Sequence, residues 1–152
     1  MIEVRPGAAA DLDALAGLFD GYRQFYGQAT DVAAARAFLD ARMQRQESVI
    51  LLASRAGQAI GFCQLYPIFS SVSMRRAWLL NDLYVHPQAR GAGAGEALLE
   101  AAAAHARAAG AAWLMLQTAH DNLPAQRLYA RTGWQRDAHF HTYLLDLCGN
   151  PL

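Results

Sequence analysis

The 152-residue sequence lacks several features that would point to particular protein classes. It has no excess of either charge, because thirteen basic residues balance thirteen acidic ones. This balance gives no general attraction to nucleic acid or to an anionic membrane, although it leaves room for a local charged patch. Its two cysteines, Cys63 and Cys148, cannot form a disulfide framework. No apolar run approaches a membrane span, and the N-terminus has no signal-peptide core. We therefore expect a cytoplasmic enzyme or binding module without nucleic-acid or membrane partners.

Apolar residues recur at helical or strand spacing along most of the chain, and their 54% share is typical of a globular protein. The expected elements, in order, are strand 2–5, helix 11–25, a helix from Thr30-Asp31 to about 45, strands 48–54, 59–66 and 78–85, helix 95–109, strand 112–118, helix 123–132 and strand 141–147. Strands 48–54 and 59–66 should form a hairpin, and residues 67–73 a polar loop. This order implies one α/β domain over residues 1–152, with a mixed central sheet flanked by helices.

A loop with three alternating glycines joins strand 78–85 to helix 95–109. Glycines let the backbone turn its N–H groups inward and let a phosphate approach closely. The start of the helix adds unpaired N–H groups and the positive end of its dipole, and an arginine at the loop entrance can add a charge-assisted hydrogen bond. A tight turn alone would need one glycine and no arginine. We therefore predict a phosphate site formed by Arg90, Gly91, Gly93, Ala94 and Gly95.

Two common nucleotide-binding loops disagree with the surrounding residues. A Rossmann loop follows its strand directly and has an acidic residue about 20 positions further on. Here residues 86–90 intervene, and residues 110–118 contain no Asp or Glu. A P-loop requires Gly-Lys-Ser/Thr, whereas Glu96 follows Gly95. Neither pattern accounts for the loop.

Residues 83–99 instead resemble the acetyl-CoA-binding segment of the GNAT N-acetyltransferase superfamily. The core pattern of that family, Arg/Gln-x-x-Gly-x-Gly/Ala, is matched by Arg90, Gly93 and Gly95. A second family block follows in the expected order, in strand 113–118, Asn122, residues 125–129 and Gly133-Trp134. The resemblance covers roughly residues 49–147 and is closest to small-amine acetyltransferases of the polyamine or D-amino-acid type. It implies a GNAT-like acyl-CoA N-acyltransferase fold and acetyl-CoA as the acetyl donor.

The same resemblance implies roles for individual residues. Pantetheine is expected along strand 78–85, held by main-chain groups of Leu83 and Val85, where an N–H group can also serve the oxyanion. Asn122 is expected to help hold the cofactor, and Tyr129 to protonate the departing thiolate. The residues themselves leave two alternatives open, in which Asn122 is an ordinary helix N-cap and Tyr129 packs on the core.

The general base is defined less well. An amine with a pKa of ~10 must lose a proton before it can attack a thioester. Asn81-Asp82 interrupts the apolar strand 78–85, and strand alternation predicts that the two side chains lie on opposite faces. Similar polyamine acetylases carry Glu-Asp here, so Asn81 departs from the pattern and Asp82 keeps it. Asp82 is our candidate for receiving the proton or binding the amine; the alternative is a buried Asp paired with an Arg. His120, as a base, competes with an ordinary loop histidine.

Other residues are weaker candidates. Cys63 is expected in the core of a strand rather than as a nucleophile. His139 and His141 share one face of an expected strand, but they lack an evident third ligand, so we expect no metal site. Several aromatic residues can line an acceptor pocket, with ordinary core packing as the alternative: Tyr22, Phe25, Tyr26, Tyr66 and Phe69.

We therefore expect an N-acetyltransferase that moves acetyl from acetyl-CoA directly to a primary amine of a small molecule, such as a polyamine or an amino acid, in a ternary complex. One alternative acceptor is a protein N-terminus or lysine. Another alternative is a non-catalytic acyl-CoA-binding sensor, which would have little use for Tyr129 and Asp82. The oligomeric state stays open, with a homodimer through the C-terminal strands as an arrangement found in similar proteins.

Overall fold

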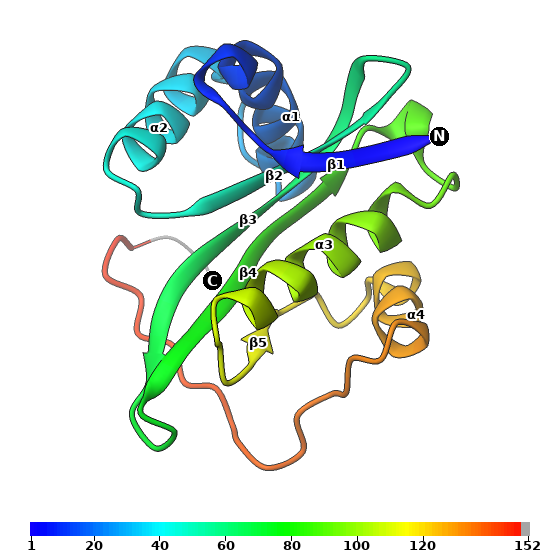
Figure 1. Ribbon diagram of the computed structural model, residues 1–152. Helices are drawn as coiled ribbons and strands as arrows, with labels where there is room; N and C mark the ends of the chain where they lie inside the picture. The colour runs from blue at the N-terminus through cyan, green and yellow to red at the C-terminus, as the bar shows by residue number, and fades with distance from the viewer. Residues whose placement is uncertain (150–152) are drawn as a thin grey trace.

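The computed structural model describes residues 1–149 and builds one five-stranded sheet with helices on both faces (Figure 1). The strands are β1 (Ile2–Pro6), β2 (Val49–Arg55), β3 (Gln58–Ser70), β4 (Arg75–Val85) and β5 (Leu114–Met115). The helices are α1 (Leu12–Phe25), α2 (Val32–Gln44), α3 (Ala94–Ala108) and α4 (Leu123–Arg131), with short 3-10 turns η1 (Ala9–Asp11) and η2 (Pro87–Ala89). Strands β1 to β4 pair antiparallel in sequence order, and β5 joins β4 in parallel. The predicted mixed sheet and α/β class are therefore confirmed.

The central strands are apolar on both sides because each face of the sheet is covered. Along β2, Ile50 and Leu52 pack into a cluster with α1 and α2, whereas Leu51 and Ala53 pack into a second cluster with α3. Figure 1 shows α1 and α2 on one face, with α3 on the other. The site described below lies where the first face meets the β4 edge of the sheet.

The loop between α1 and α2 is fixed by one buried carboxylate. Asp20 on α1 accepts hydrogen bonds from Gln24 Nε2 at 2.8 Å, from Thr30 Oγ1 at 2.7 Å and from the N–H of Asp31 at 2.7 Å. The Asp31 side chain in turn accepts from the N–H of Ala34 at 3.0 Å, which makes it the N-cap of α2, as the sequence predicted. These bonds hold α2 at a fixed position relative to α1.

Two sequence predictions about strands are wrong. Residues 67–73 are not a polar loop, because β3 continues to Ser70 and pairs with β4 from Arg75 onward. Residues 141–147 are not a strand, because no regular element follows α4 in residues 135–149. The apolar alternation is present there, but a strand also needs a neighbour to pair with, and β5 is only two residues long instead of the predicted 112–118. The apolar side chains of this segment are consequently 68% to 90% exposed: Tyr143, Leu144, Leu145 and Leu147.

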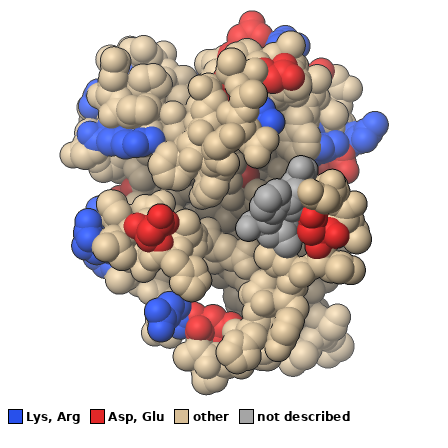
Figure 2. Space-filling model, turned by 180° about the vertical axis from the view of Figure 1, so that it is seen from behind, with Lys and Arg blue, Asp and Glu red and all other residues tan. Residues whose placement is uncertain are grey.

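The surface carries few charges, and they are dispersed. On the face shown in Figure 2, Arg side chains and Asp and Glu side chains lie scattered among uncharged ones, without a continuous patch of either sign. No helix within residues 1–149 is both long enough and apolar enough to cross a membrane.

Candidate active site

The centre of the candidate site is a bulge in β4. Leu80 pairs with Leu65 of β3 and Asp82 pairs with Gln64, so Asn81 is an extra residue on β4. A bulge of this kind interrupts the alternation of a strand. The prediction that Asn81 and Asp82 point to opposite faces is therefore wrong: Asn81 Nδ2 donates to Asp82 Oδ1 at 2.7 Å. Tyr22 Oη on α1 donates to the main-chain oxygen of Asn81 at 3.0 Å, which ties the bulge to the helix.

Asp82 is almost fully buried, with 1% of its surface exposed, and each of its carboxylate oxygens accepts one hydrogen bond from a side-chain amide. Gln64 Nε2 donates to Oδ2 at 2.6 Å, opposite the bond from Asn81 to Oδ1. Burial raises the pKa of Asp82, while these two hydrogen bonds lower it, and the net shift is upward. Within residues 1–149 no arginine forms an ion pair with Asp82. The alternative of a structural Asp–Arg pair is therefore wrong.

A group of tyrosines surrounds this carboxylate. Tyr22 and Tyr26 on α1 contact each other with ring centroids 5.1 Å apart. Burial raises the pKa of Tyr22, and the charges of Asp82, Tyr26, Tyr66 and Tyr129 raise it further, so these groups lie close enough to influence one another. Burial and the Asp82 charge also raise the pKa of Tyr66 to about 12. The fold thus brings side chains from α1, β3, β4 and α4 to one site.

The two phenylalanines of the predicted acceptor pocket lie further out. Phe25 contacts Tyr26, with centroids 5.3 Å apart, but is 57% exposed. Phe69 is 72% exposed near the end of β3, and the Arg76 guanidinium lies 4.9 Å from its ring centroid. It stands five residues beyond Gln64 on the same strand, which corresponds to about 17 Å. Phe69 therefore does not belong to the site.

On its other side, the C-terminal half of β4 has no neighbouring strand within residues 1–149. β5 pairs with β4 only at Trp78 and Leu79. The N–H of His86 donates to Ile60 of β3, and main-chain groups of successive strand residues point to alternate sides. The N–H groups of Leu83 and Val85 therefore point toward the open edge, where an extended ligand can hydrogen-bond to them.

Arg90 lies against this edge. Its Nε donates to the main-chain oxygen of Val85 at 2.9 Å, and its guanidinium lies 5.6 Å from the ring centroid of Tyr84. The Val85 oxygen is therefore already occupied, and its N–H remains for a ligand. Because Arg has five N–H donors, the four on its two Nη atoms stay available for an anion.

The three glycines of the loop serve two different purposes. Gly91 and Gly93 have φ angles of 79° and 91°, in the left-handed region, and a Cβ at either would meet no atom within 4 Å. Glycine is needed there for backbone conformation rather than for space. A Cβ at Gly95, in contrast, would lie 3.2 Å from Leu128 Cδ2, so this glycine permits close contact between α3 and α4.

The start of α3 fits a phosphate group. The helix begins at Ala94, one residue earlier than predicted, and its first turn leaves the N–H groups of residues 94–96 without intrahelical partners, whereas the N–H of Ala97 donates to the Gly93 oxygen. Ala94 has no polar side-chain atom, so this residue can offer only its main-chain N–H. The N–H groups at the start of α3, the glycine loop and the Arg90 guanidinium together offer donors and positive charge to which an anion such as a phosphate can bind.

The two predicted residues at α4 have identifiable environments. Asn122 Oδ1 accepts from the N–H of Ala125 at 3.3 Å, so Asn122 caps the helix, and this bond leaves its Nδ2 for a ligand. Tyr129 is half-buried, with its ring centroid 6.3 Å from that of Trp134. Burial and the nearby Tyr26 raise the pKa of Tyr129, so the phenol stays protonated at neutral pH and can donate a proton.

The remaining sequence candidates lie outside the site. His120 is exposed before α4, and its main-chain oxygen accepts from Gln126 Nε2 at 3.0 Å. Cys63 is fully buried, and burial raises its pKa to about 12, in agreement with a core role. His139 and His141 lie in the segment that forms no strand, so they no longer share a strand face.

Sequence reasoning missed two residues of the site, Ser48 and Gln64. Gln64 is a fully buried polar residue inside an apolar strand, the same signal that drew attention to Asn81-Asp82. Ser48 Oγ donates to Gln64 Oε1 at 2.8 Å. The residues around Ser48 in the sequence do not predict this contact, because Ser48 and Gln64 meet only through the β2–β3 pairing.

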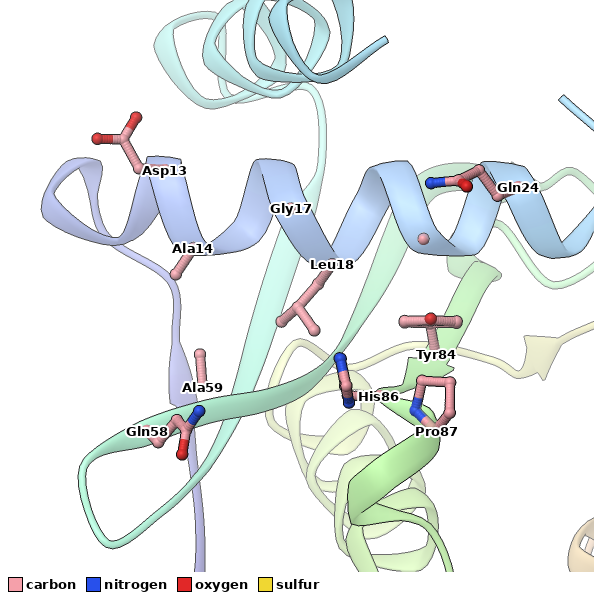
Figure 3. Close-up of a pocket in the computed structure, with 11 residues that line it drawn as sticks. Asp13, Ala14, Gly17, Leu18, Gln24, Gln58, Ala59, Tyr84, His86 and Pro87 are labelled. Atoms are coloured by element: carbon pink, nitrogen blue, oxygen red, sulfur yellow. The ribbon is translucent and has the colours of Figure 1, made fainter. Parts of the chain in front are cut away.

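A separate groove of about 700 Å³ runs between α1 and the ends of β3 and β4. Figure 3 shows Leu18 pointing from α1 into it, with Tyr84 and His86 on the strand side. The helix approaches β4 closely here, since a Cβ at Gly21 would lie 2.7 Å from Tyr84 Oη. Neither Asp82 nor the tyrosines around it line this groove, so we do not place the reaction there.

Comparison with known proteins identifies the family of the chain. Residues 15–134 match the model of the acetyltransferase (GNAT) family. The chain is 49% identical over 146 residues to the uncharacterized N-acetyltransferase YhfO of Bacillus subtilis (strain 168), covering 96% of this chain and 98% of that protein. A solved structure described as a probable acetyltransferase is 39% identical, with a TM-score of 0.92 over 97% of this chain and 99% of that one. The ribosomal-protein-alanine N-acetyltransferase of Brucella melitensis biovar Abortus 2308 shares the fold, with a TM-score of 0.78 at 21% identity over 96% of this chain and 99% of that one.

Proposed function

Because the chain belongs to the acetyltransferase (GNAT) family and is an acetyltransferase, we propose that acetyl-CoA is its donor and that a primary amine of a small molecule is its acceptor. The observation that carries the proposal is the buried Asp82 carboxylate, set in a bulge among tyrosines and next to the open edge of β4. Attack occurs directly, in a complex of the enzyme with both substrates, because the one cysteine in the neighbourhood, Cys63, is buried with a raised pKa.

The family generally uses acetyl-CoA, and the residues present fit it. The N-terminus of α3 with Gly91 and Gly93 would hold the pyrophosphate, together with the Nη groups of Arg90. Asn122 would add its Nδ2, and the N–H groups at the open edge of β4 would hold the pantetheine. When bound, this donor supplies an acetyl group already activated as a thioester.

Asp82 accepts the proton that the amine must lose. An alkylammonium ion has a pKa of ~10 and becomes a nucleophile only after deprotonation. Burial makes Asp82 a stronger base than an exposed aspartate, and its two amide partners keep enough of it ionised to act. The N–H bond of the amine breaks and an O–H bond forms on the carboxylate.

Two further groups act on the acetyl thioester. The N–H of Leu83 or Val85 donates to the acetyl oxygen as negative charge develops on it. Tyr129 then gives its phenolic proton to the departing sulfur, for which its raised pKa keeps the proton in place beforehand. The first role depends on the N–H groups of β4 that point toward its open edge, and the second depends on the position of Tyr129 on α4.

The burial of Asp82 supports a small acceptor. A carboxylate with only 1% of its surface exposed is approached more easily by a slender alkylamine than by an amine held on the surface of a folded protein. The test is thiol release from acetyl-CoA over a panel of polyamines, amino acids and N-terminal peptides. We expect turnover with small amines. Turnover with peptides alone would move the acceptor to protein, and tight acetyl-CoA binding without turnover on any amine would make the chain a sensor.

We also propose that the chain forms a homodimer through residues 135–149. This segment lies outside the sheet and carries strongly exposed apolar side chains, among them Tyr143 and Leu145. Light scattering should give the mass of two chains, and Leu145→Asp should reduce it to one. A monomer at all concentrations would refute the arrangement.

A further inference from the structure

A chain of hydrogen bonds runs from strand to strand along the sheet and ends at Asp82. It runs from Ser48 Oγ to Gln64 Oε1 at 2.8 Å and from Gln64 Nε2 to Asp82 Oδ2 at 2.6 Å. Gln64 and Asp82 are both essentially inaccessible to solvent. Burying such groups costs free energy unless their hydrogen bonds are satisfied, and apolar side chains of similar size are often as stable. The fold alone therefore gives no reason for Gln64 in this strand.

The bonds fix which end of the Gln64 amide faces Asp82. With the amide reversed, Oε1 would stand 2.6 Å from a carboxylate oxygen, and two acceptors would oppose each other. The hydroxyl of Ser48 stabilises the observed orientation, because it donates to Oε1. Each carboxylate oxygen of Asp82 thus receives one amide N–H, from Gln64 on β3 and from Asn81 in the bulge.

We propose that Gln64, oriented by Ser48, is a positioning residue for Asp82, which holds the carboxylate in place and favours its charged form for proton transfer. This proposal rests on the proposed role of Asp82 as the base. The hydrogen bond from Gln64 lowers the pKa of Asp82 and so opposes the effect of burial. Without it, the carboxylate would hold a proton over a wider range of pH and would be unable to accept one from the amine.

Other titratable groups do not obscure this effect. Those that face Asp82 or its neighbours are Tyr22 and Tyr26 on α1, Cys63 and Tyr66 on β3, Tyr129 on α4 and Arg42 on α2. The tyrosines and the cysteine all have raised pKa values and are neutral where a carboxylate titrates. The acid limb of the pH–rate profile therefore reports on Asp82.

The test compares pH profiles of kcat/KM for the amine in wild type and in Gln64→Met, which keeps the length of the side chain but removes the amide. The loss of one of two amide donors should move the acid limb upward by about one pH unit. At pH values well above the limb, the rate should return toward that of wild type, and the affinity for acetyl-CoA should not change. Ser48→Ala should give a smaller shift in the same direction, and Ser48→Thr, which keeps the hydroxyl, should restore the wild-type profile.

The matched control is Gln44→Met, which removes a bond of the same kind at the surface, from Gln44 Nε2 to Asp40 Oδ1 at 3.0 Å. Its profile should coincide with that of wild type. If Asp82→Asn abolishes turnover while Gln64→Met and Ser48→Ala leave the limb in place, Gln64 is structural and this proposal is wrong. If Asp82→Asn turns over normally, the proposed function itself is wrong. Should Gln64→Met fail to fold or to bind acetyl-CoA, the Ser48→Ala and Ser48→Thr pair decides.

Discussion

Replacing Asp82 by Asn removes a charge from the site and leaves the shape of the side chain almost unchanged. The new amide must fit between two existing amides, from Gln64 and Asn81. Its oxygen can accept from one of them, and its NH₂ group then faces a donor on the other side. Rotation of the Gln64 amide resolves this conflict, because Gln64 Oε1 can then accept from the new NH₂ while Ser48 accepts from Nε2. The variant should therefore fold.

The expected loss of activity is large. A general base contributes about 10²- to 10⁴-fold to turnover. Since only 1% of Asp82 is exposed, bulk water has little access to replace it, and we expect a decrease in kcat of about a thousandfold, or about 4 kcal/mol in activation free energy. The affinity for acetyl-CoA should be unchanged, because Asp82 faces the α1 side of the sheet.

The same substitution should not destabilise the protein at neutral pH. The folded state raises the pKa of Asp82 above its ordinary value of 3.8. Its contribution to stability is therefore fully present below this unfolded-state value and is lost as the pH rises through the folded-state pKa. At pH 7 the wild type bears the cost of a buried charge that the Asn variant lacks.

The assay is thiol release from acetyl-CoA with the best amine of the panel, alongside thermal unfolding at pH 4 and pH 7. We expect the melting temperature of Asp82→Asn to equal or exceed that of wild type at pH 7, and the advantage to shrink at pH 4. A variant with less than a tenfold loss in kcat would refute the assignment of the base. A variant that melts well below wild type at pH 7 would refute the view that the buried charge of Asp82 destabilises the folded wild type.

Three further predictions concern the donor side and the frame of the site. Tyr129→Phe should lower kcat by about a hundredfold with little change in acetyl-CoA affinity. An unchanged rate would mean that Tyr129 only packs on the core. Arg90→Ala should raise KM for acetyl-CoA by about tenfold or more, because charged hydrogen bonds to the phosphate are lost. Gly93→Val should also raise KM, because a β-branched residue resists a φ of 91°. An unchanged KM in both variants would show that this loop does not bind the phosphate. Asp20→Asn should lower the melting temperature near neutral pH. Hydrogen bonds from the N–H of Asp31 and from Thr30 lower the pKa of Asp20, so its contribution is present above the unfolded-state value of 3.8 and is lost as the pH falls through the folded-state value. A difference in melting temperature that stays constant down to pH 2 would contradict this origin.

Much of the fold could be predicted from the sequence because it is encoded by local periodicity. The helix that begins after Asp31 and the hairpin of β2 and β3 follow from apolar spacing and from capping or turn residues within a few positions. The backbone conformation of the glycine loop was predictable for the same reason, since Gly91 and Gly93 adopt the left-handed conformation within one short segment. These features need no information from distant parts of the chain.

The rest of the candidate site depends on pairing between strands. The bulge at Asn81 exists because the register between β4 and β3 shifts there, and no residue of β4 by itself predicts this shift. The contact from Gln64 to Asp82, 18 positions apart, follows from that register, and the contact from Ser48 to Gln64, 16 positions apart, follows from the pairing of β2 with β3. The strand predicted at 141–147 failed for a related reason, because apolar alternation does not guarantee a partner strand.

The close contact at Gly95 links the two ends of the donor site. Gly95 lies in the first turn of α3, where the phosphate is expected, and Leu128, which it contacts, directly precedes Tyr129 on α4. A Cβ at position 95 would lie tightly against the end of the Leu128 side chain, which would have to give way by a few tenths of an ångström. We expect a larger residue at this position to shift Leu128, and with it Tyr129 on the same helix, even if every phosphate contact survived. The size of the residue at position 95 therefore affects both the binding of the donor's phosphate and the position of the proposed acid, Tyr129.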